Sequence, residues 1–399
     1  MSSSHVLVLN CGSSSLKFAI IDSSSAKEHL SGLAERLGES SPQIKYKFNG
    51  QKHIISLSSG DAHEVAINEL VDLVKSLKLD QQLVAVGHRV VHGGEHFTKS
   101  ALINDTVLDA IKQTATLAPL HNPANLLGIE AASDAFATLP QVAVFDTAFH
   151  QSMEPTAFLY ALPYSLYEKH SVRRYGFHGT SHFYVSAQAI EQLGLTNKSS
   201  KIVTAHLGNG CSVCAVKDGK SVDTSMGLTP LEGLVMGTRS GDIDPGLFAY
   251  LVNQLGYSAS QIDTLLNKKS GLLGISELSN DCRTIEESAA DGHEKAQLAL
   301  DIFCFRLAKQ IASFAVPLGG IDALVFTGGI GENSDVIRAS VVNQLSFLGF
   351  ELNNERNLAA RFGSEGVITE DSSNPIAMVI PTNEELVIAQ DAAMLAGEQ

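Results

Sequence analysis

Two strand–turn–strand patterns, at 6–22 and 201–216, constrain the fold of this chain more than any other feature. In the first, the apolar run 6–9 predicts a buried strand, the turn Asn-Cys-Gly-Ser-Ser-Ser (10–15) follows, and 16–22 resumes as a second strand. In the second, strands at 201–205 and 212–216 flank the turn at 206–210. Either pattern alone is also compatible with an ordinary hairpin. Together they predict a duplicated α/β architecture facing a cleft.

The first turn has the chemistry of a phosphate site. Its backbone N–H groups and serine hydroxyls can donate hydrogen bonds, and the neighbouring Lys17 supplies positive charge. It is not a P-loop, because the Gly-x4-Gly-Lys-Ser/Thr spacing is absent and a strand follows where a P-loop has a helix.

A third glycine-rich turn, 327–334, follows the apolar strand expected at 323–326. Three such turns after strands indicate a nucleotide held between two lobes, with phosphates against the first two turns and the nucleoside against the third. None fits the dinucleotide pattern Gly-x-Gly-x-x-Gly followed by an acidic residue about 20 positions on.

The remaining pattern is that of an ordinary α/β protein. Apolar periodicity predicts helices at 65–77, 102–117, 124–137, 297–318, 336–348 and 386–395. A hairpin is expected around Asn49-Gly50, and a helix after 175–182 is expected to be capped by Thr180 or Ser181. The strand 142–145 delivers Asp146 at its carboxyl end, where α/β folds usually place functional groups.

The charge balance limits the partners. With 43 Asp and Glu against 28 Lys and Arg, the net charge is −15, which argues against nucleic acid or an anionic membrane as a partner. An anionic substrate would need local cations, and Arg89 and Arg239 both lie in glycine-bearing loops. His178, between glycines, is either a ligand donor or a structural histidine.

Segments for export or membrane insertion are not evident. No apolar run of 18 residues occurs, and the first residues lack the basic start of a signal peptide. The five cysteines form no zinc or disulfide framework. We therefore expect a soluble, cytoplasmic protein with reduced cysteines.

Ten motifs in order resemble one family, the acetate kinases of the acetokinase group within the actin/hexokinase/Hsp70-like superfamily. The motifs are LNCGSSSLKF (9–18), GHRVVHGGE (87–95), APLHNP (118–123), FDTAFH (145–150), YGFHGTSH (175–182), HLGNG (206–210), DTSMGLTPLEG (223–233), GTRSGDIDPG (237–246), FTGGIGENS (326–334) and PTNEEL (381–386). They cover nearly the whole chain.

The resemblance implies a duplicated actin-like (ribonuclease H-like) fold with a nucleotide cleft between two lobes. Residues 1–150, completed by a C-terminal helix at 385–399, would form the first lobe, and 151–384 the second, nucleotide-binding lobe. The implied reaction is reversible, in-line transfer of the ATP γ-phosphoryl group to acetate, giving acetyl phosphate and ADP. It would use Mg²⁺, with Mn²⁺ as an alternative, in a homodimer without nucleic-acid or membrane partners.

The same resemblance assigns site residues. The implied catalytic residues are Asp146, His178 and Arg239. The implied acetate site comprises Arg89, Val91, Leu120, Phe177 and Pro230. The implied ATP contacts are Lys17, His206, Leu207, Gly208, Asn209, Gly210, Asp281, Cys282, Arg283, Gly329, Ile330, Gly331, Glu332 and Asn333. Asn10 and Glu384 would hold the metal.

Three details refine this expectation. Acetate is already ionised at neutral pH, so Asp146 is expected to orient groups or link to the metal and not to act as an obligatory base. Val91 should crowd a longer acyl chain. Cys282 lies where some relatives place an aromatic residue near the adenine, which leaves purine stacking open.

Two alternatives remain. One is a propionate or other short-chain acyl kinase of the same fold. The other is an actin-like or Hsp70-like ATPase, in which Arg89 and Arg239 would have no anionic acceptor to serve.

Overall fold

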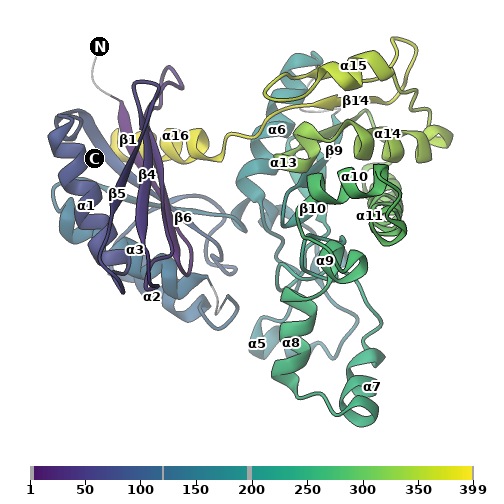
Figure 1. Ribbon diagram of the computed structural model, residues 1–399, viewed down its shortest axis with the longest axis horizontal. Helices are drawn as coiled ribbons and strands as arrows, with labels where there is room; N and C mark the ends of the chain where they lie inside the picture. Colours follow the sequence, from purple (N-terminus) through teal and green to yellow (C-terminus); the bar gives the residue numbers. More distant parts are fainter. Residues whose placement is uncertain (1–3, 119–120, 196–199, 398–399) are drawn as a thin grey trace. The chain divides into compact units, whose positions relative to one another are not determined.

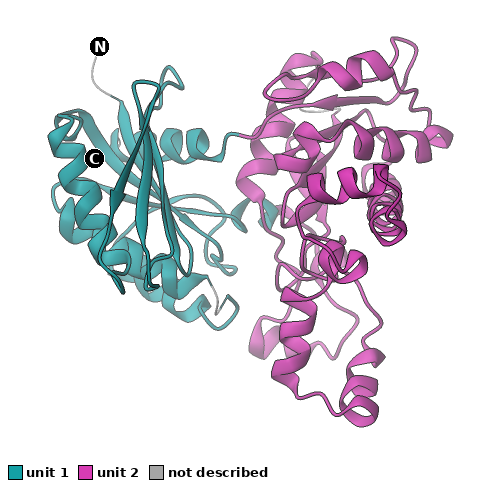
Figure 2. Cartoon of the chain, in the orientation of Figure 1, with its two compact units in different colours: residues 1–151, 383–399 teal, residues 152–382 magenta. Residues whose placement is uncertain are grey.

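The computed structural model describes residues 4–118, 121–195 and 200–397. The chain forms two compact units, residues 1–151 with 383–399, and residues 152–382 (Figure 2). Each unit contains one β-sheet with helices packed on it (Figure 1). Within the described residues, none of the helices combines the length and apolar character needed to cross a membrane.

The first unit is built on an eight-stranded sheet with the order β5-β4-β3-β2-β1-β6-β8-β7. Its strands are β1 (His5–Cys11), β2 (Ser15–Asp22), β3 (Glu28–Glu35), β4 (Gln43–Phe48), β5 (Gln51–Ser56), β6 (Leu83–Val90), β7 (Ala101–Leu102) and β8 (Gln141–Phe145). The strands β1 to β5 run antiparallel in succession, whereas β1, β6 and β8 are parallel.

The second unit repeats the central part of this topology. Its six-stranded sheet has the order β11-β10-β9-β12-β14-β13. The strands are β9 (Lys201–Leu207), β10 (Cys211–Lys217), β11 (Lys220–Thr224), β12 (Ala323–Thr327), β13 (Gly366–Val367) and β14 (Ile376–Val379). Three antiparallel strands, β11 to β9, again continue into parallel β12 and β14. The expected duplication of an actin-like α/β fold is confirmed.

Helices cover both faces of the first sheet. They are α1 (His63–Ser76), α2 (Asp105–Thr114), α3 (Asn122–Ala135) and α16 (Glu384–Gly397). Alternate residues of β1, including Leu7 and Leu9, share a buried core with α1 and α3. On the other face, α16 packs on β1 and β6, where Gly87 permits the approach because a Cβ there would lie 2.6 Å from Ile388 Cγ2.

The helices of the second unit are mostly short. They are α4 (Pro155–Phe158), α5 (Ser165–His170), α6 (Gly179–Gln192), α7 (Gly246–Leu255), α8 (Ala259–Lys268), α9 (Gly271–Ser276), α10 (Cys282–Ala290), α11 (Glu294–Ser313), α12 (Ala315–Leu318), α13 (Gly328–Asn333), α14 (Asp335–Gln344) and α15 (Asn354–Ala359). Short 3₁₀ helices occur at Asp80–Gln82 in the first unit, at Ala148–Ser152 where the two units join in sequence, and at Ser346–Leu348 in the second unit.

Three sequence predictions of local structure were wrong. The helix expected at 102–117 begins only at Asp105, because Asn104 accepts a hydrogen bond from the backbone N–H of Val107 and caps it. The cap of α6 is His178, not Thr180 or Ser181. The expected turn at 327–334 contains the short helix α13.

Candidate active site

An arginine–aspartate pair lies at the carboxyl ends of two parallel strands of the first unit's sheet. Arg89 lies in β6 and not in the expected loop, because the strand continues to Val90. Asp146 directly follows β8, which runs parallel to β6, so both side chains reach the carboxyl ends of these strands. Arg89 donates from Nε to Asp146 Oδ1 at 2.9 Å and from Nη2 to Oδ2 at 2.6 Å. The side chain of Asp146 is 1% exposed and that of Arg89 22%. The pair is bidentate, which fixes the plane of the guanidinium.

Electrostatics keep Arg89 charged in spite of its burial. Desolvation alone would lower the pKa of the guanidinium, but Asp146 and then Glu384 outweigh it, and the pKa lies above its ordinary value. Arg89 therefore remains a cation at these strand ends throughout the physiological pH range.

A small cavity beside this pair gathers four of the predicted residues. Its volume is about 30 Å³, and its lining includes Asn10, Lys17, Arg89 and Glu384. Asn10 comes from β1, Lys17 from β2 and Glu384 from the first turn of α16. The motifs LNCGSSSLKF and PTNEEL thus meet within one unit although they lie near opposite ends of the sequence.

Glu384 has an unsatisfied oxygen in this cavity. Its Oε1 is buried and has no hydrogen-bond partner among the described residues. Burial raises the pKa of Glu384, and Asp146 and Glu385 add to the rise, against an opposing effect of Arg89. A buried carboxylate oxygen left without a donor, beside the amide of Asn10, is a donor set that fits a hard divalent cation such as Mg²⁺.

Lys17 has a carboxylate partner, Glu385, which the sequence reasoning did not single out. The Nζ of Lys17 donates to Glu385 Oε1. Burial alone would raise the pKa of Glu385, but the hydrogen bond and charge of Lys17 prevail and lower it. The only sequence signal for Glu385 was its position beside Glu384 in the PTNEEL motif.

In the second unit, His178 is held in an unusual backbone conformation. It precedes α6 with φ +56° and ψ +24°, in the left-handed region. Its Nδ1 lies 2.8 Å from Ser212 Oγ, and its ring stacks on that of His206 with centroids 4.2 Å apart. The serine also contacts His182 Nε2 at 2.7 Å. The position of the His178 ring is therefore fixed by two neighbouring strands.

His178 and Arg239 both lie next to Gly210. A Cβ built on Gly210 would lie 3.3 Å from Arg239 Nη1 and 3.6 Å from His178 Cε1. A methyl group there would press on Arg239 Nη1 and would touch His178 at an ordinary van der Waals distance. The last residue of the turn 206–210 thus contacts the region of the His178 imidazole and the Arg239 guanidinium.

Arg239 differs from Arg89 in its partners. Its Nη1 donates to the Pro230 carbonyl oxygen at 3.0 Å and lies 3.8 Å from Met236 Sδ. Among the described residues we find no ion pair for Arg239. Burial lowers the pKa of Arg239, with a small opposing effect of Cys211. A half-buried guanidinium without a carboxylate is a ready site for an anionic ligand.

The second unit also contains a large cavity of about 640 Å³. The predicted ATP residues that line it are Gly208, Asn209, Asp281, Cys282, Arg283, Gly329, Ile330 and Asn333. Those that do not line it are His206, Leu207, Gly210, Gly331 and Glu332, together with Lys17, which belongs to the first unit. Glu332 instead accepts from the backbone N–H groups of Gly328 at 2.9 Å and Thr382 at 3.1 Å. Its carboxylate joins α13 to the segment after β14.

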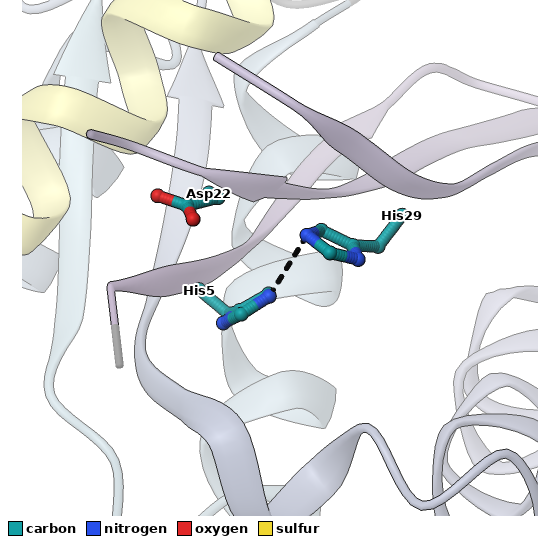
Figure 3. Close-up of side chains that lie close together, drawn as sticks. All are labelled: His5, Asp22 and His29. Atoms are coloured by element: carbon teal, nitrogen blue, oxygen red, sulfur yellow. Dashed lines mark hydrogen bonds between the residues drawn. The ribbon is translucent and has the colours of Figure 1, made fainter. Parts of the chain in front are cut away.

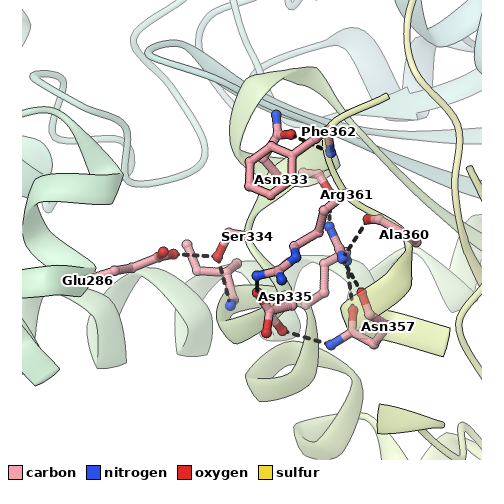
Figure 4. Close-up of polar contacts among 11 residues, drawn as sticks. Glu286, Asn333, Ser334, Asp335, Asn357, Ala360, Arg361 and Phe362 are labelled. Atoms are coloured by element: carbon pink, nitrogen blue, oxygen red, sulfur yellow. Dashed lines mark hydrogen bonds and ion pairs between the residues drawn. The ribbon is translucent and has the colours of Figure 1, made fainter. Parts of the chain in front are cut away.

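The wall of this cavity includes side chains that the sequence reasoning missed. Arg361 Nη1 donates to Asp335 Oδ1 at 2.7 Å, and the backbone N–H of Phe362 donates to Asn333 Oδ1 at 3.0 Å (Figure 4). Arg361 and Phe362 both line the cavity, and Phe362 is 75% exposed. No sequence signal marked these two positions, because they follow a helix that shares no motif with the glycine-rich turns.

The four residues expected around the acyl group are distributed over both units. Val91 in the first unit is 9% exposed, and Phe177 in the second is 2% exposed. Pro230 is half-buried and contacts Arg239 through its carbonyl oxygen. Leu120 lies outside the described residues.

Comparison with known proteins gives one family. Residues 5–390 match the model of the Acetokinase family. The chain is 61% identical to an acetate kinase of Shewanella amazonensis over 400 residues, covering 100% of both chains.

Solved structures agree with this match. A propionate kinase from Francisella tularensis subsp. tularensis superposes with a TM-score of 0.93 at 49% identity, over 98% of this chain and 99% of that one. The acetate kinase of Porphyromonas gingivalis has a TM-score of 0.93 at 44% identity, with the same coverage.

Proposed function

We propose that this chain, which belongs to the acetokinase family, is an acetate kinase that transfers the γ-phosphoryl group of ATP to acetate. The observation that carries the proposal is the meeting of His178 and Arg239 at Gly210, with a half-buried guanidinium that has no carboxylate partner among the described residues. Such a guanidinium suits the charge that spreads over a phosphoryl group in transfer.

The reaction forms a bond between an acetate oxygen and the γ-phosphorus while the bond from that phosphorus to the β,γ-bridging oxygen breaks. The electron pair of that bond leaves with ADP. No proton has to be removed from the acceptor, since carboxyl groups are ionised at neutral pH. Catalysis then requires positioning and charge stabilisation.

We assign these tasks to the following residues. Arg89 binds the acetate carboxylate, and Asp146 orients Arg89 through the two hydrogen bonds. His178 and Arg239 stabilise the transferring group. The residues that line the 640 Å³ cavity bind ATP, with Lys17 as a further contact.

Asn10 and Glu384 are the residues that would hold the metal. The buried, unpartnered Oε1 of Glu384 supports this assignment. When bound, Mg²⁺, or Mn²⁺ in its place, supplies positive charge to the phosphate oxygens. Asp146 and Arg89 act on the acceptor.

Acyl selectivity is proposed to rest on Val91, Leu120, Phe177 and Pro230. A crowded apolar pocket disfavours one extra methylene by only about 1–3 kcal/mol, so propionate should react less well than acetate. The structural similarity to a propionate kinase makes a propionate kinase the second candidate.

Two further features belong to the proposal. We infer a homodimer, for which the exposed apolar side chains of α7, among them Phe248 (49% exposed) and Tyr250 (55%), offer a contact surface. We also infer a cytoplasmic location, where ATP is available and where the five free cysteines would stay reduced.

Hydroxylamine trapping of the acyl phosphate tests the function. With ATP and Mg²⁺, acetate should give more hydroxamate than propionate or butyrate at equal concentration. A preference for propionate would favour the second candidate. ATP hydrolysis without acyl phosphate would instead indicate an ATPase.

A further inference from the structure

We propose that His5, Asp22 and His29 form a binding site for a divalent transition metal of the zinc class, separate from the proposed kinase site (Figure 3). His5 opens β1, whereas Asn10 lies five residues further along it. At about 3.3 Å per strand residue, the two positions are roughly 16 Å apart.

The side chains are close enough to share one ion. The Nε2 atoms of His5 and His29 lie 2.9 Å apart, and the ring centroids 4.3 Å apart. One potential ligand atom from each of the three residues lies within 4.8 Å of the other two. Two imidazole nitrogens on one tetrahedral zinc, with bonds of about 2.0–2.1 Å, stand about 3.3 Å apart. The rings need to separate by only a few tenths of an ångström.

The backbone brings the three residues to one place. His5 and Asp22 are direct partners in the antiparallel register of β1 and β2, so their side chains share a face of the sheet. In the next pair, Ile20 faces Leu30 and Ile21 faces Glu28, which leaves His29 as the extra residue of a β-bulge. A bulge changes the direction of a side chain, and here it accompanies the contact of His29 with His5.

The carboxylate of Asp22 is oriented by its neighbours. Its Oδ1 accepts from Ser24 Oγ at 2.6 Å, from Ser4 Oγ at 2.7 Å and from the backbone N–H of Ser24 at 2.9 Å. These hydrogen bonds, those of Ser24 first, hold the pKa of Asp22 below its usual range. A carboxylate fixed by such outer contacts is the typical third ligand of a histidine metal site.

The exposure of the three residues leaves room for a further ligand. His5 is 9% exposed, and the other two are half-buried, so water can occupy a fourth position.

The donor set also determines which ion binds. Two imidazoles and one carboxylate favour Zn²⁺, Co²⁺, Ni²⁺ or Cu²⁺ over Mg²⁺, which prefers oxygen ligands. The Mg²⁺ needed for the proposed kinase reaction should therefore not compete. A bound ion would tie β1, β2 and β3 together at this end of the sheet.

The test uses the untagged, full-length protein after treatment with a chelator. It is titrated with Zn²⁺ in competition with a chromophoric zinc indicator, in excess Mg²⁺. We expect one ion bound per chain and an affinity that falls more than 100-fold in the H5Q/H29Q double variant, since even outer-shell partners are worth about 10–100-fold. Asp22→Asn should weaken binding by a smaller factor, and Co²⁺ should give the visible absorption of a tetrahedral site.

The matched control is His53→Gln. His53 is another histidine of the same sheet and stacks on Tyr46 at 4.8 Å, away from the proposed ligands. Its loss should leave zinc affinity unchanged. Kinase activity with Mg²⁺ reports on folding, because none of the three ligands belongs to the proposed catalytic machinery. Equal zinc binding by wild type and double variant, or no binding by either, would overturn the proposal.

Discussion

Arg89 and Asp146 form a two-point hydrogen-bonded pair, with the guanidinium donating to both carboxylate oxygens at 2.9 and 2.6 Å. The acid is the more deeply buried partner, and the arginine keeps part of its surface accessible. In the proposed function, Asp146 would act on the acceptor site through Arg89, which would give an acidic residue a role in a reaction whose acceptor has no proton to lose.

Replacing Asp146 with Asn should reduce kcat at least about 100-fold, because the freed guanidinium loses its fixed orientation. Acyl phosphate formation by hydroxylamine trapping is the measurement. Glu35→Gln is the control, since it removes a half-buried carboxylate that pairs with Lys45 at 2.6 Å. Near-normal turnover in Asp146→Asn would refute the orienting role.

Replacing Arg239 with Ala should lower kcat about a thousandfold while changing the acetate KM much less. A guanidinium that serves the transition state has this signature, and Arg239→Lys should recover only part of the loss. Arg356→Ala, which removes a surface ion pair with Asp371, serves as the control. An effect confined to KM would mean that Arg239 only binds ground-state substrate.

Gly210→Ala should reduce kcat without unfolding the protein. The new methyl group would press on Arg239 Nη1 at 3.3 Å and lie 3.6 Å from His178 Cε1. Gly397→Ala, where a Cβ meets nothing within 4 Å, should retain wild-type rates. Steady-state kinetics measures kcat of both variants, and thermal unfolding shows whether they are folded. An unchanged kcat for Gly210→Ala would contradict a catalytic role of His178 and Arg239 at this position.

Glu384 and Glu385 should affect stability in opposite directions. The pKa of Glu384 is raised in the folded state, so the folded protein binds the extra proton, and the free energy of unfolding falls as the pH rises above about 4.3. Glu384→Gln should therefore stabilise the metal-free protein at pH near 7 more than at acidic pH, while impairing turnover.

Glu385 provides the matched comparison. Its pKa is lowered, so its stabilising contribution is present at neutral pH and is lost as the pH falls through the folded-state value. Glu385→Gln should therefore destabilise the protein at neutral pH. Urea unfolding at acidic and neutral pH gives the free energy of unfolding of both variants. Changes of the same sign at neutral pH would contradict the opposite effects expected of Glu384 and Glu385.

Phe362→Ala should raise the KM for ATP by roughly fivefold or more, because stacking of a base on an aromatic ring contributes about 1–3 kcal/mol. Phe362 is the aromatic side chain among the residues that line the 640 Å³ cavity. Phe347→Ala is a close control, since Phe347 is 74% exposed against 75% for Phe362 but does not line the cavity. Equal KM values in the two variants would remove Phe362 from the base site.

The sequence was informative where local chemistry decides structure. The turn signal Asn49-Gly50 predicted the hairpin of β4 and β5, and the two glycine-bearing hairpins predicted the duplicated topology. It was less informative where the conformation of a segment depends on packing against a neighbouring strand. Gly328 has φ +76° and stands where a Cβ would lie 2.7 Å from the Leu207 carbonyl oxygen, so the start of α13 depends on packing against β9.

The same limit applies to the candidate site. Motifs identified groups such as Asn10 and Glu384, and the structure places both beside one small cavity. The hydrogen bonds of Glu332 and the position of Phe362 depend on which segments of the chain lie next to each other in the fold. Motif spacing could therefore not predict them.

The placement of α16 has a consequence for biosynthesis. The first unit takes its last helix from residues 383–399, after the entire second unit in the chain. During translation, the sheet of the first unit emerges early, but Glu384 and the partner of Lys17 arrive only after residues 152–382 have been made. A nascent chain therefore lacks half of its proposed metal ligands, so phosphoryl transfer should be restricted to chains whose synthesis has passed residue 384.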